Sequence, residues 1–229
     1  MLDPVILFED NHCLALAKPG GLLTQGLPVG LPTLWAWARD YLRTTYHKTG
    51  NVYLGVPHRL DRPVSGVVMF AKSSKAAARL AEQFRDRQVI KVYQALVQGQ
   101  VTPTEGVWID WLKKLPEQAR AEIVQEVTPE ARRAETKYQV QSVTAAGTLL
   151  QLIPHTGRMH QLRIQSASRS WPILGDRTYG SQSAFGPPVE LDRDRLIALH
   201  AASLTFLHPI RYEPLTVTAP LPDYWPKKT

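Results

Sequence analysis

A charged loop followed directly by an apolar strand constrains this chain more than any other stretch. Residues His58–Gly66 place the carboxylate of Asp61 among two arginines and a histidine, with a proline on each side. Residues 67–71 follow at once, and their apolar composition predicts a strand that is buried on both faces. The fold must therefore hold a charged loop at the end of a rigid core element, which is a common way to fix a reactive side chain.

Two residues of this loop restrict its backbone. Pro63 drives Arg62 into an extended conformation, and Gly66 permits the close approach of another backbone or of a ligand. The neighbouring cations favour the ionised form of Asp61, and a carboxylate can act as a nucleophile or stabilise a cation. A structural ion pair without chemistry would have the same composition, so these residues alone leave both interpretations open.

Composition narrows the class of protein. The chain has 229 residues, enough for one large or two small domains, and its formal charge is +7. A basic balance suggests a polyanionic partner, first of all nucleic acid, although many mildly basic proteins bind none. The single cysteine, Cys13, excludes an internal disulfide and a cysteine-rich zinc site. The chain shows neither a signal-peptide pattern nor an apolar run of about 18 residues, so we expect a cytoplasmic protein.

Periodicity and capping residues predict a chain of mixed α and β structure. A hairpin is expected first, and Lys18–Gly21 should break its second strand. Residues 101–133 are polar and interrupted by three prolines, so they are expected to be irregular excursions within one domain. Lys227 and Lys228 should form a frayed basic tail. Helices are expected at 33–46 and 73–87, and strands at 5–8, 13–17, 67–71, 89–98, 134–143, 148–153, 196–207 and 215–217.

Lys91 and Tyr93 lie two residues apart on a predicted strand, so their side chains should point to the same face. If that face looks into a cleft, it offers a cation beside a ring on which a base could stack. A tyrosine that is partly buried on a sheet is the alternative interpretation.

The segment His155–Gln165 is the third stretch that could carry function. Thr156 is a plausible helix N-cap, and a helix is expected to continue to about Ser168. The first turn of such a helix presents N–H groups that suit a phosphate, and His160 and Arg163 should share one helix face. A basic helix end exposed to solvent would give the same pattern.

Several motifs occur in one order that resembles the RluA family of pseudouridine synthases. The opening hairpin and two later segments are similar to that family as well, so the resemblance covers nearly the whole chain. Several motifs in register are far more specific than any one of them. The motifs are HRLDRPVSGVVMFAK, QFRDRQVIKVYQALVQG and HTGRMHQLR, and the additional segments are ILFEDNHCLALAKPGGLL, WPILGDRTYG and LHAASLTFLHP.

The resemblance implies an α+β pseudouridine synthase catalytic fold, with a mixed, mainly antiparallel sheet, flanking helices and a central RNA-binding cleft. Residues 1–229 would form a single catalytic domain without a separate N-terminal RNA-binding domain. The implied reaction isomerises specific uridines in structured RNA, either rRNA or tRNA. The N1-glycosidic bond breaks, the uracil turns, and C5 bonds to the same sugar carbon. No cofactor and no metal are implied, RNA is the implied partner, and we expect a monomer.

The resemblance also assigns roles to individual residues. Asp61 matches the catalytic aspartate, and Arg163 matches the arginine that partners it. Tyr93 matches the tyrosine that stacks on the uracil near the C5 proton. Arg59 matches the arginine that helps to displace the target base from its stack. Whether Asp61 attacks the sugar or removes a sugar proton is left open. Further candidates for binding RNA or the base are His58, Lys91, Arg158 and His160.

Two positions depart from the family pattern, and two other functions stay open. Val64 stands where a threonine is common, and Gln165 stands where a histidine is frequent. A nucleoside glycosidase would commonly need a second carboxylate, and Asp176, the only other candidate in a recognisable motif, has a turn-like setting that looks structural. An RNA-binding protein of the same fold without catalysis is the other alternative, although binding alone needs no carboxylate near phosphates.

Overall fold

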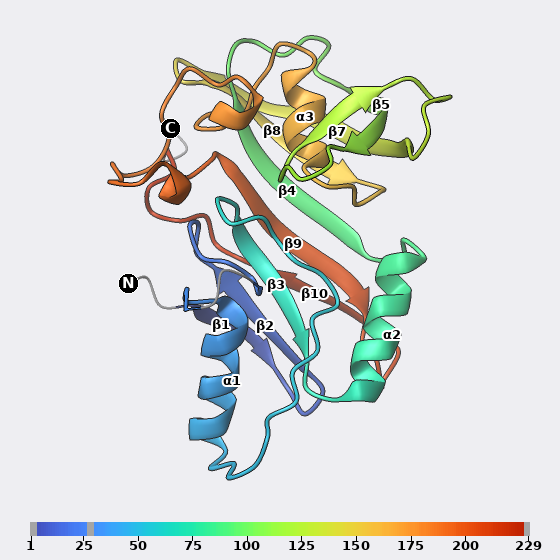
Figure 1. Cartoon of the computed structure of the whole chain (residues 1–229), viewed down its shortest axis with the longest axis vertical. Coiled ribbons are helices and arrows are strands. Elements are labelled where there is room, and N and C mark those ends of the chain that lie inside the picture. Colours follow the sequence, from blue (N-terminus) through green and yellow to red (C-terminus); the bar gives the residue numbers. More distant parts are fainter. Residues whose placement is uncertain (1–3, 27–29, 227–229) are drawn as a thin grey trace. The chain divides into compact units, whose positions relative to one another are not determined.

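A computed structural model describes residues 4–26 and 30–226 of the chain (Figure 1). The predicted tail at Lys227 and Lys228 lies outside the described residues. The chain divides into two compact units. Unit 1 comprises the residues up to Val89 together with Ala201–Pro222, and unit 2 comprises Ile90–His200 together with the residues from Asp223 onward.

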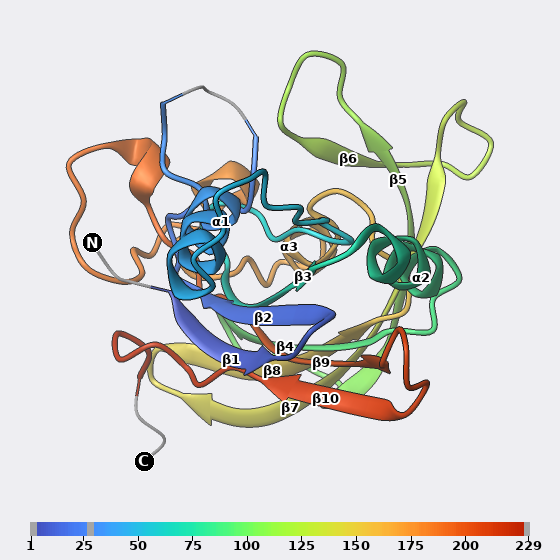
Figure 2. The ribbon, with the colours of Figure 1, turned by 90° about the horizontal axis from the view of Figure 1, so that it is seen from below.

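Unit 1 combines a curled sheet with two helices. The strand order is β1-β2-β3-β9-β10, and the outer strands β1 and β10 lie side by side, so the sheet curls around the core (Figure 2). Both helices are capped by side chains, since Thr33 accepts a hydrogen bond from the N–H of Ala36 and Ser73 accepts one from the N–H of Ala76. The elements are β1 (Val5–Glu9), β2 (Cys13–Lys18), α1 (Leu34–Thr45), β3 (Ser65–Ala71), α2 (Ser74–Arg85), β9 (Leu199–Leu207) and β10 (Pro214–Thr218).

The core of unit 1 follows from strand alternation. Cys13 and Ala15 of β2 lie on one face with Met69 of β3, and Leu80 of α2 packs in the same cluster. Every residue of β3 is buried, as the apolar run after the charged loop predicts. The close approach expected at Gly66 is also confirmed, because an added Cβ there would lie 2.2 Å from the carbonyl oxygen of Ala201.

Unit 2 is an antiparallel sheet with one α-helix packed on it. Its strands follow the order β4-β8-β7-β5-β6, and these neighbours are antiparallel. Ile164 of α3 packs with Leu112, Ala134 and Tyr179 in a small core cluster, and Figure 1 shows α3 lying along this sheet. The elements are β4 (Ile90–Val97), β5 (Glu105–Lys114), β6 (Ala121–Val124), β7 (Arg132–Thr144), β8 (Gly147–Pro154), α3 (Gln161–Ala167), η1 (Arg177–Tyr179) and η2 (Asp192–Asp194).

The expectation of irregular structure over residues 101–133 is wrong. This stretch contains the ten-residue strand β5 and the shorter strand β6, which pair as a hairpin. Pro103 precedes β5 and Pro116 lies in the loop between β5 and β6, so neither proline interrupts a strand. Pairing with β7 along most of β5 stabilises the strand, and this partner is distant enough in sequence that local composition does not reveal it.

The helix expected from Thr156 to about Ser168 is also corrected. It begins only at Gln161 and is preceded by His160, whose φ of 51° is left-handed. Thr156 is not the N-cap, because its hydroxyl accepts a hydrogen bond from the N–H of Glu135 and donates one to Gln161 Oε1. The same Gln161 oxygen accepts from the N–H of Arg158, so a turn closed by side chains replaces the first helical turns.

The expected fold class is confirmed. Antiparallel pairing dominates in both units, and a parallel bridge between Leu23 and Thr33 makes the pairing mixed. Three α-helices among the described residues complete the α+β composition. Within the described residues, none of the helices is both long and apolar enough to cross a bilayer.

Candidate active site

The loop that carries Asp61 is fixed on its N-terminal side by Thr24. The Thr24 hydroxyl accepts a hydrogen bond from the N–H of Leu60 at 3.1 Å and donates one to the carbonyl of Leu60 at 2.9 Å. Thr24 is itself buried, so water competes little for these bonds. One side chain therefore holds both backbone groups of the residue that precedes Asp61.

The C-terminal side of Asp61 is fixed just as firmly. The carbonyl of Arg62 accepts a hydrogen bond from the N–H of Gly21 at 2.8 Å, and Arg62 Nε donates to the carbonyl of Gly21 at 2.8 Å. The N–H of Val64 donates to the carbonyl of Asp61 at 3.1 Å and closes the turn. Val64 itself is buried. The half-buried Asp61 is thus held between two residues whose backbone cannot move freely.

Lys18 is a residue of this loop region that the sequence analysis missed. Its side chain is buried, and Nζ donates to the carbonyls of Pro19 at 2.9 Å, Leu22 at 2.7 Å and Arg62 at 3.1 Å. Burial lowers the pKa of Lys18 to about 7, while the negative charge of Asp61 opposes that shift. Lys18 therefore joins the end of β2 to the Asp61 loop through these backbone carbonyls.

His58 and Arg59 precede Asp61 and differ in their surroundings. His58 Nε2 accepts a hydrogen bond from the N–H of Met69 at 2.9 Å, and its ring stacks on Phe84 of α2 at a centroid distance of 4.6 Å. These contacts give His58 a structural role in unit 1, and its role in RNA binding stays a prediction. Arg59 is exposed, and within the described residues its side chain takes part in no hydrogen bond or ion pair.

In unit 2, Arg163 is held by a buried carboxylate. Arg163 Nε lies 2.6 Å from Asp176 Oδ2, and Nη2 lies 2.8 Å from Oδ1, which makes a bidentate pair. The side chains of Arg163 and Asp176 are 7% and 1% exposed, so the pair is shielded from water. Asp176 thus has the structural setting expected from its sequence context, and it fixes the direction of the guanidinium.

Two of the predicted site residues, His160 and Arg163, contact the side chain of Tyr179. Its hydroxyl lies 2.9 Å from His160 Nδ1, and the guanidinium carbon of Arg163 lies 5.2 Å from its ring centroid. The hydroxyl also accepts a hydrogen bond from the N–H of Ala121 in β6 at 3.0 Å. His160 and Arg163 therefore contact the same ring, as their spacing suggested, although His160 lies before the helix.

Lys91 and Tyr93 lie on β4, and both are half-buried. Lys91 Nζ donates to the carbonyl of Thr156 at 3.3 Å, which directs their common strand face toward the turn before α3. Arg158 of that turn donates from Nε to the carbonyl of Arg133 at 3.1 Å.

Gln165, which replaces a histidine that is frequent in the family, is completely buried. Its Oε1 accepts a hydrogen bond from Thr136 at 2.7 Å, and its Nε2 donates to Asp110 at 2.7 Å. Gln165 thus links α3 to β5 and β7. Although it departs from the family pattern, its side chain is fully hydrogen-bonded within the core.

The predicted site residues form one group in each unit. Asp61, Arg59 and His58 lie in unit 1, whereas Tyr93, Arg163 and the remaining candidates lie in unit 2. The structure brings His160 and Arg163 together at Tyr179. The pairing of Asp61 with Arg163 stays a prediction, and so does the stacking of Tyr93 on a uracil.

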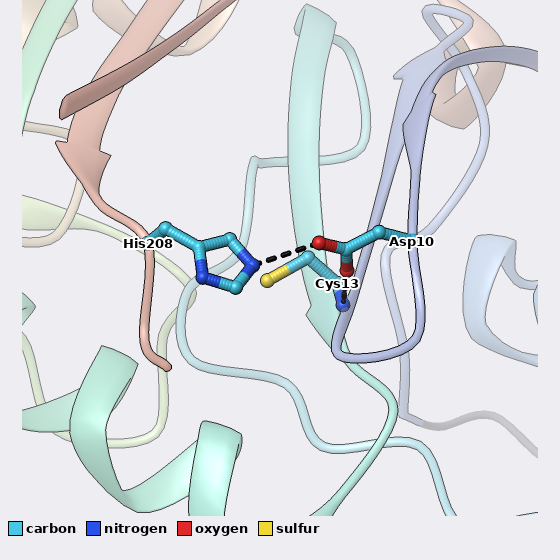
Figure 3. A group of neighbouring side chains, drawn as sticks. All are labelled: Asp10, Cys13 and His208. Atoms are coloured by element: carbon cyan, nitrogen blue, oxygen red, sulfur yellow. Dashed lines mark hydrogen bonds and ion pairs between the residues drawn. The ribbon is translucent and has the colours of Figure 1, made fainter. Parts of the chain in front are cut away.

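A separate cluster of Asp10, Cys13 and His208 has donor atoms within 4.8 Å of one another, as a metal site would (Figure 3). His208 Nε2 lies 2.8 Å from Asp10 Oδ2, and His208 Nδ1 accepts hydrogen bonds from the N–H groups of Ile210 and Arg211. Both ring nitrogens are thus occupied. Burial raises the pKa of the Cys13 thiol to about 12, so no thiolate is offered at neutral pH. The cluster fits a structural link between two turns better than a metal site.

Comparison with known proteins identifies the family. Residues 12–168 match the family of RNA pseudouridylate synthases. The chain is 34% identical to the dual-specificity RNA pseudouridine synthase RluA of Vibrio cholerae over 97% of this chain and 84% of that protein. It is also 34% identical to the tRNA pseudouridine synthase C of Haemophilus influenzae over 96% of this chain and 94% of that protein. The identity to the ribosomal large subunit pseudouridine synthase C of Escherichia coli is again 34%, over 97% of this chain and 68% of that protein.

The fold agrees with the sequence comparison. The solved structure of the human RNA pseudouridylate synthase domain containing 4 superposes with a TM-score of 0.78 at 26% identity, over 96% of this chain and 89% of that one. Fold and motifs together define an isomerase that acts on RNA. The chain belongs to the RluA family of RNA pseudouridine synthases, as the motifs of the sequence indicate.

Proposed function

We propose that this chain converts specific uridines of ribosomal or transfer RNA to pseudouridine and that residues 1–229 act as one catalytic domain. The relatives named above act on both kinds of RNA by their descriptions. The reaction is an isomerisation, since one glycosidic bond breaks and another forms at the same sugar carbon. The observation that carries the proposal is the fixed position of Asp61, because hydrogen bonds to Thr24 and Gly21 hold the residues on either side of it, Leu60 and Arg62.

Asp61 is the proposed catalytic residue. A carboxylate can attack the sugar carbon as the N1 bond breaks, or it can remove a sugar proton, and both routes require the ionised form. Fixed backbone on both sides reduces the reorganisation needed to reach the reacting atom.

Arg163 is the proposed partner of Asp61, and Tyr93 is the proposed stacking residue. A guanidinium carries five N–H donors in a planar fork that suits carboxylates, and Asp176 fixes the direction of the Arg163 guanidinium. Tyr93 would offer a flat ring to a uracil that has to turn over within the site. Its hydroxyl would lie near the proton that leaves C5.

Base displacement is the step for which we propose Arg59. A base inside a helix cannot turn over, and leaving the stack costs a few kcal/mol. The exposed side chain of Arg59 suits insertion into the vacated position. Lys91, Arg158, His160 and His58 are proposed to bind the base or the backbone around it, with His58 also holding the loop through Met69.

The proposal also covers the location, oligomeric state and partner of the enzyme. We expect it to act in the cytoplasm as a monomer, with RNA as its partner and without cofactor or metal. The formal charge of +7 supports contact with phosphates irrespective of sequence.

Mapping pseudouridine across total RNA tests the proposal. RNA from cells without this protein is compared with RNA from the same cells after its return as wild type or as Asp61→Asn. We expect specific ribosomal or transfer RNA positions to lose pseudouridine and to regain it only with the wild type. Unchanged maps in all three samples would contradict the proposal.

The two alternative functions predict other outcomes. A glycosidase would release free uracil from RNA, but the second carboxylate it would need, Asp176, is buried and bound to Arg163. A protein that only binds RNA would restore a lost cellular phenotype equally well as wild type and as Asp61→Asn. Free uracil after incubation with RNA, or full rescue by the Asn variant, would favour these alternatives.

A further inference from the structure

Unit 2 contains a pocket that lies beside the α3 region. It has a volume of about 490 Å³ and is formed by the end of β5, the loop that follows it, the start of β6, the start of β7 and the turn at Arg158 and Met159. This volume lies in the range of about 300–1,000 Å³ that is usual for pockets that bind small molecules. The residues assigned to uridine chemistry do not line it, apart from Arg158.

The pocket combines an apolar interior with a basic rim. Its apolar contacts come from Leu112, Leu115, Pro116 and Met159, which suit the face of a base.

Four cations and a single carboxylate, Glu130, also line the pocket. Among these cations, the side chains of Lys113, Lys114 and Arg132 form no hydrogen bond or ion pair within the described residues. Cations without a protein partner can bind phosphate and release its counterions. The lining therefore matches the two parts of a nucleotide, an apolar base and an anionic phosphate.

The sheet register places Leu112, Lys114 and Arg132 of the lining on one face, whereas the side chain of Lys113 points to the opposite face. Lys114 pairs with Ala121, and Leu112 pairs with Arg132, so these four side chains point to the same side. Leu112 packs with Ile164 of α3 on that side.

The wall of the pocket is also tied to the Arg163 group. The N–H of Ala121 donates to the hydroxyl of Tyr179, and Arg163 lies over the ring of Tyr179. A ligand in the pocket would thus bind next to the residue proposed as the partner of Asp61.

We propose that this pocket, defined by Leu112, Lys114, Leu115, Arg132 and Met159, binds a second, unpaired nucleotide of the same RNA that carries the target uridine. The base would enter the apolar interior, and its phosphates would bind the rim. The inference rests on the proposed function for the identity of the ligand as RNA. It gives unit 2 a means of selecting RNA by a nucleotide away from the target uridine.

Charge reversal and polar substitution test the pocket, each with a control on the opposite sheet face. Lys114→Glu is compared with Lys137→Glu, because Lys137 lies opposite Val107 on the other face. Leu115→Asn is compared with Ile109→Asn, because Ile109 is exposed on the same sheet face as Lys137. The probe is total RNA carrying tritium at uridine C5, taken from cells that lack the protein. Filter retention at several salt concentrations gives the Kd, and label release is measured in parallel.

We expect Lys114→Glu to raise the Kd about tenfold and to reduce the salt dependence by about one phosphate contact. Leu115→Asn should raise the Kd severalfold without changing the salt dependence, and both controls should bind as the wild type does. Label release at saturating RNA should be retained in all four variants, since none alters a residue assigned to the chemistry.

Unchanged Kd values for both Lys114→Glu and Leu115→Asn would contradict the proposal that the pocket binds a nucleotide, even if label release is normal. A weakening by the two control variants that matches that of the pocket variants would overturn it too. Wild-type protein that binds RNA but releases no label would overturn the proposed function, and the pocket would then be judged by the Kd values alone.

Discussion

At the scale of single residues, the surroundings of Asp61 depend on side chains about 40 positions earlier in the chain. Thr24 and Lys18 bind the backbone of Leu60 and Arg62, so the position of the Asp61 loop depends on the end of β2 and the segment that follows it. The motif around Asp61 predicts a reactive carboxylate, but it does not reveal which residues hold it. That information lies in contacts between distant segments.

The Lys18 ammonium makes stability depend on pH. Its pKa is lowered from 10.5 to about 7 in the folded protein, so between these values the unfolded chain binds a proton that the folded chain does not. Stability therefore rises with pH in this window, and Lys18→Met lacks this contribution. We expect the free energy of unfolding of the wild type to increase relative to Lys18→Met from about pH 7 to pH 10, by at most about 1.4 kcal/mol per pH unit.

Urea denaturation at several pH values measures this difference. Lys75→Met, at an exposed position of α2, serves as the control and should follow the wild type. Parallel curves for the wild type and Lys18→Met between pH 6 and pH 10 would show that the Lys18 charge does not change in this range.

The pair of Arg163 and Asp176 is expected to be essential for stability in unit 2. Asp176→Asn leaves a buried guanidinium without its carboxylate, which costs about 3–5 kcal/mol. Asp192→Asn is the matched control, because Asp192 pairs with Arg195 at the surface and its side chain is 82% exposed; it should cost less than about 1 kcal/mol. Equal unfolding free energies for the two variants would contradict a structural role of the buried pair.

Tyr93→Phe separates stacking from the chemistry of the hydroxyl. The ring remains, so RNA affinity should change little, whereas turnover should be lost if the hydroxyl takes part in removing the C5 proton. Filter binding and label release on the same RNA measure the two effects. Turnover equal to that of the wild type would show that the hydroxyl has no role.

At the scale of elements, local sequence predicts the parts of the fold that depend on local interactions. The helices α1 and α2 have their Ser or Thr caps and apolar stripes within one segment, and the run at β3 is apolar throughout. The hairpin of β5 and β6 was missed because its pairing with β7 is not local. The start of α3 was misplaced because the side chain of Gln161 replaces the N-cap that Thr156 was expected to provide.

The junction of β3 with β9 gives a test at this scale. Gly66 has a φ of 118°, and an added Cβ would lie 2.2 Å from backbone atoms of Ala201. Gly66→Ala should therefore destabilise the protein by at least about 2 kcal/mol. Gly26→Ala is a matched control, because its φ is 105° but no atom lies within 4 Å of the added Cβ. Equal destabilisation by both changes, measured by urea denaturation, would mean that backbone strain alone decides the effect.

At the scale of the whole molecule, the proposed chemistry draws on both units. Asp61 belongs to unit 1, and Tyr93 and Arg163 belong to unit 2. Periodicity could indicate that each residue lies at the end of an element or on a strand face, but it could not bring them into one site. The family resemblance supplied that link, because it relates motifs that are separated by about 30 and 70 positions in the sequence.

Release of tritium from RNA labelled at uridine C5 tests the central claim most directly, because replacing the C5 hydrogen by a glycosidic bond must send that hydrogen to water. We predict that the wild type releases label and that Asp61→Asn releases none while it still binds the same RNA. Full release by Asp61→Asn would remove this carboxylate from the mechanism. A wild-type protein that binds the RNA without releasing any label would contradict the proposed function itself.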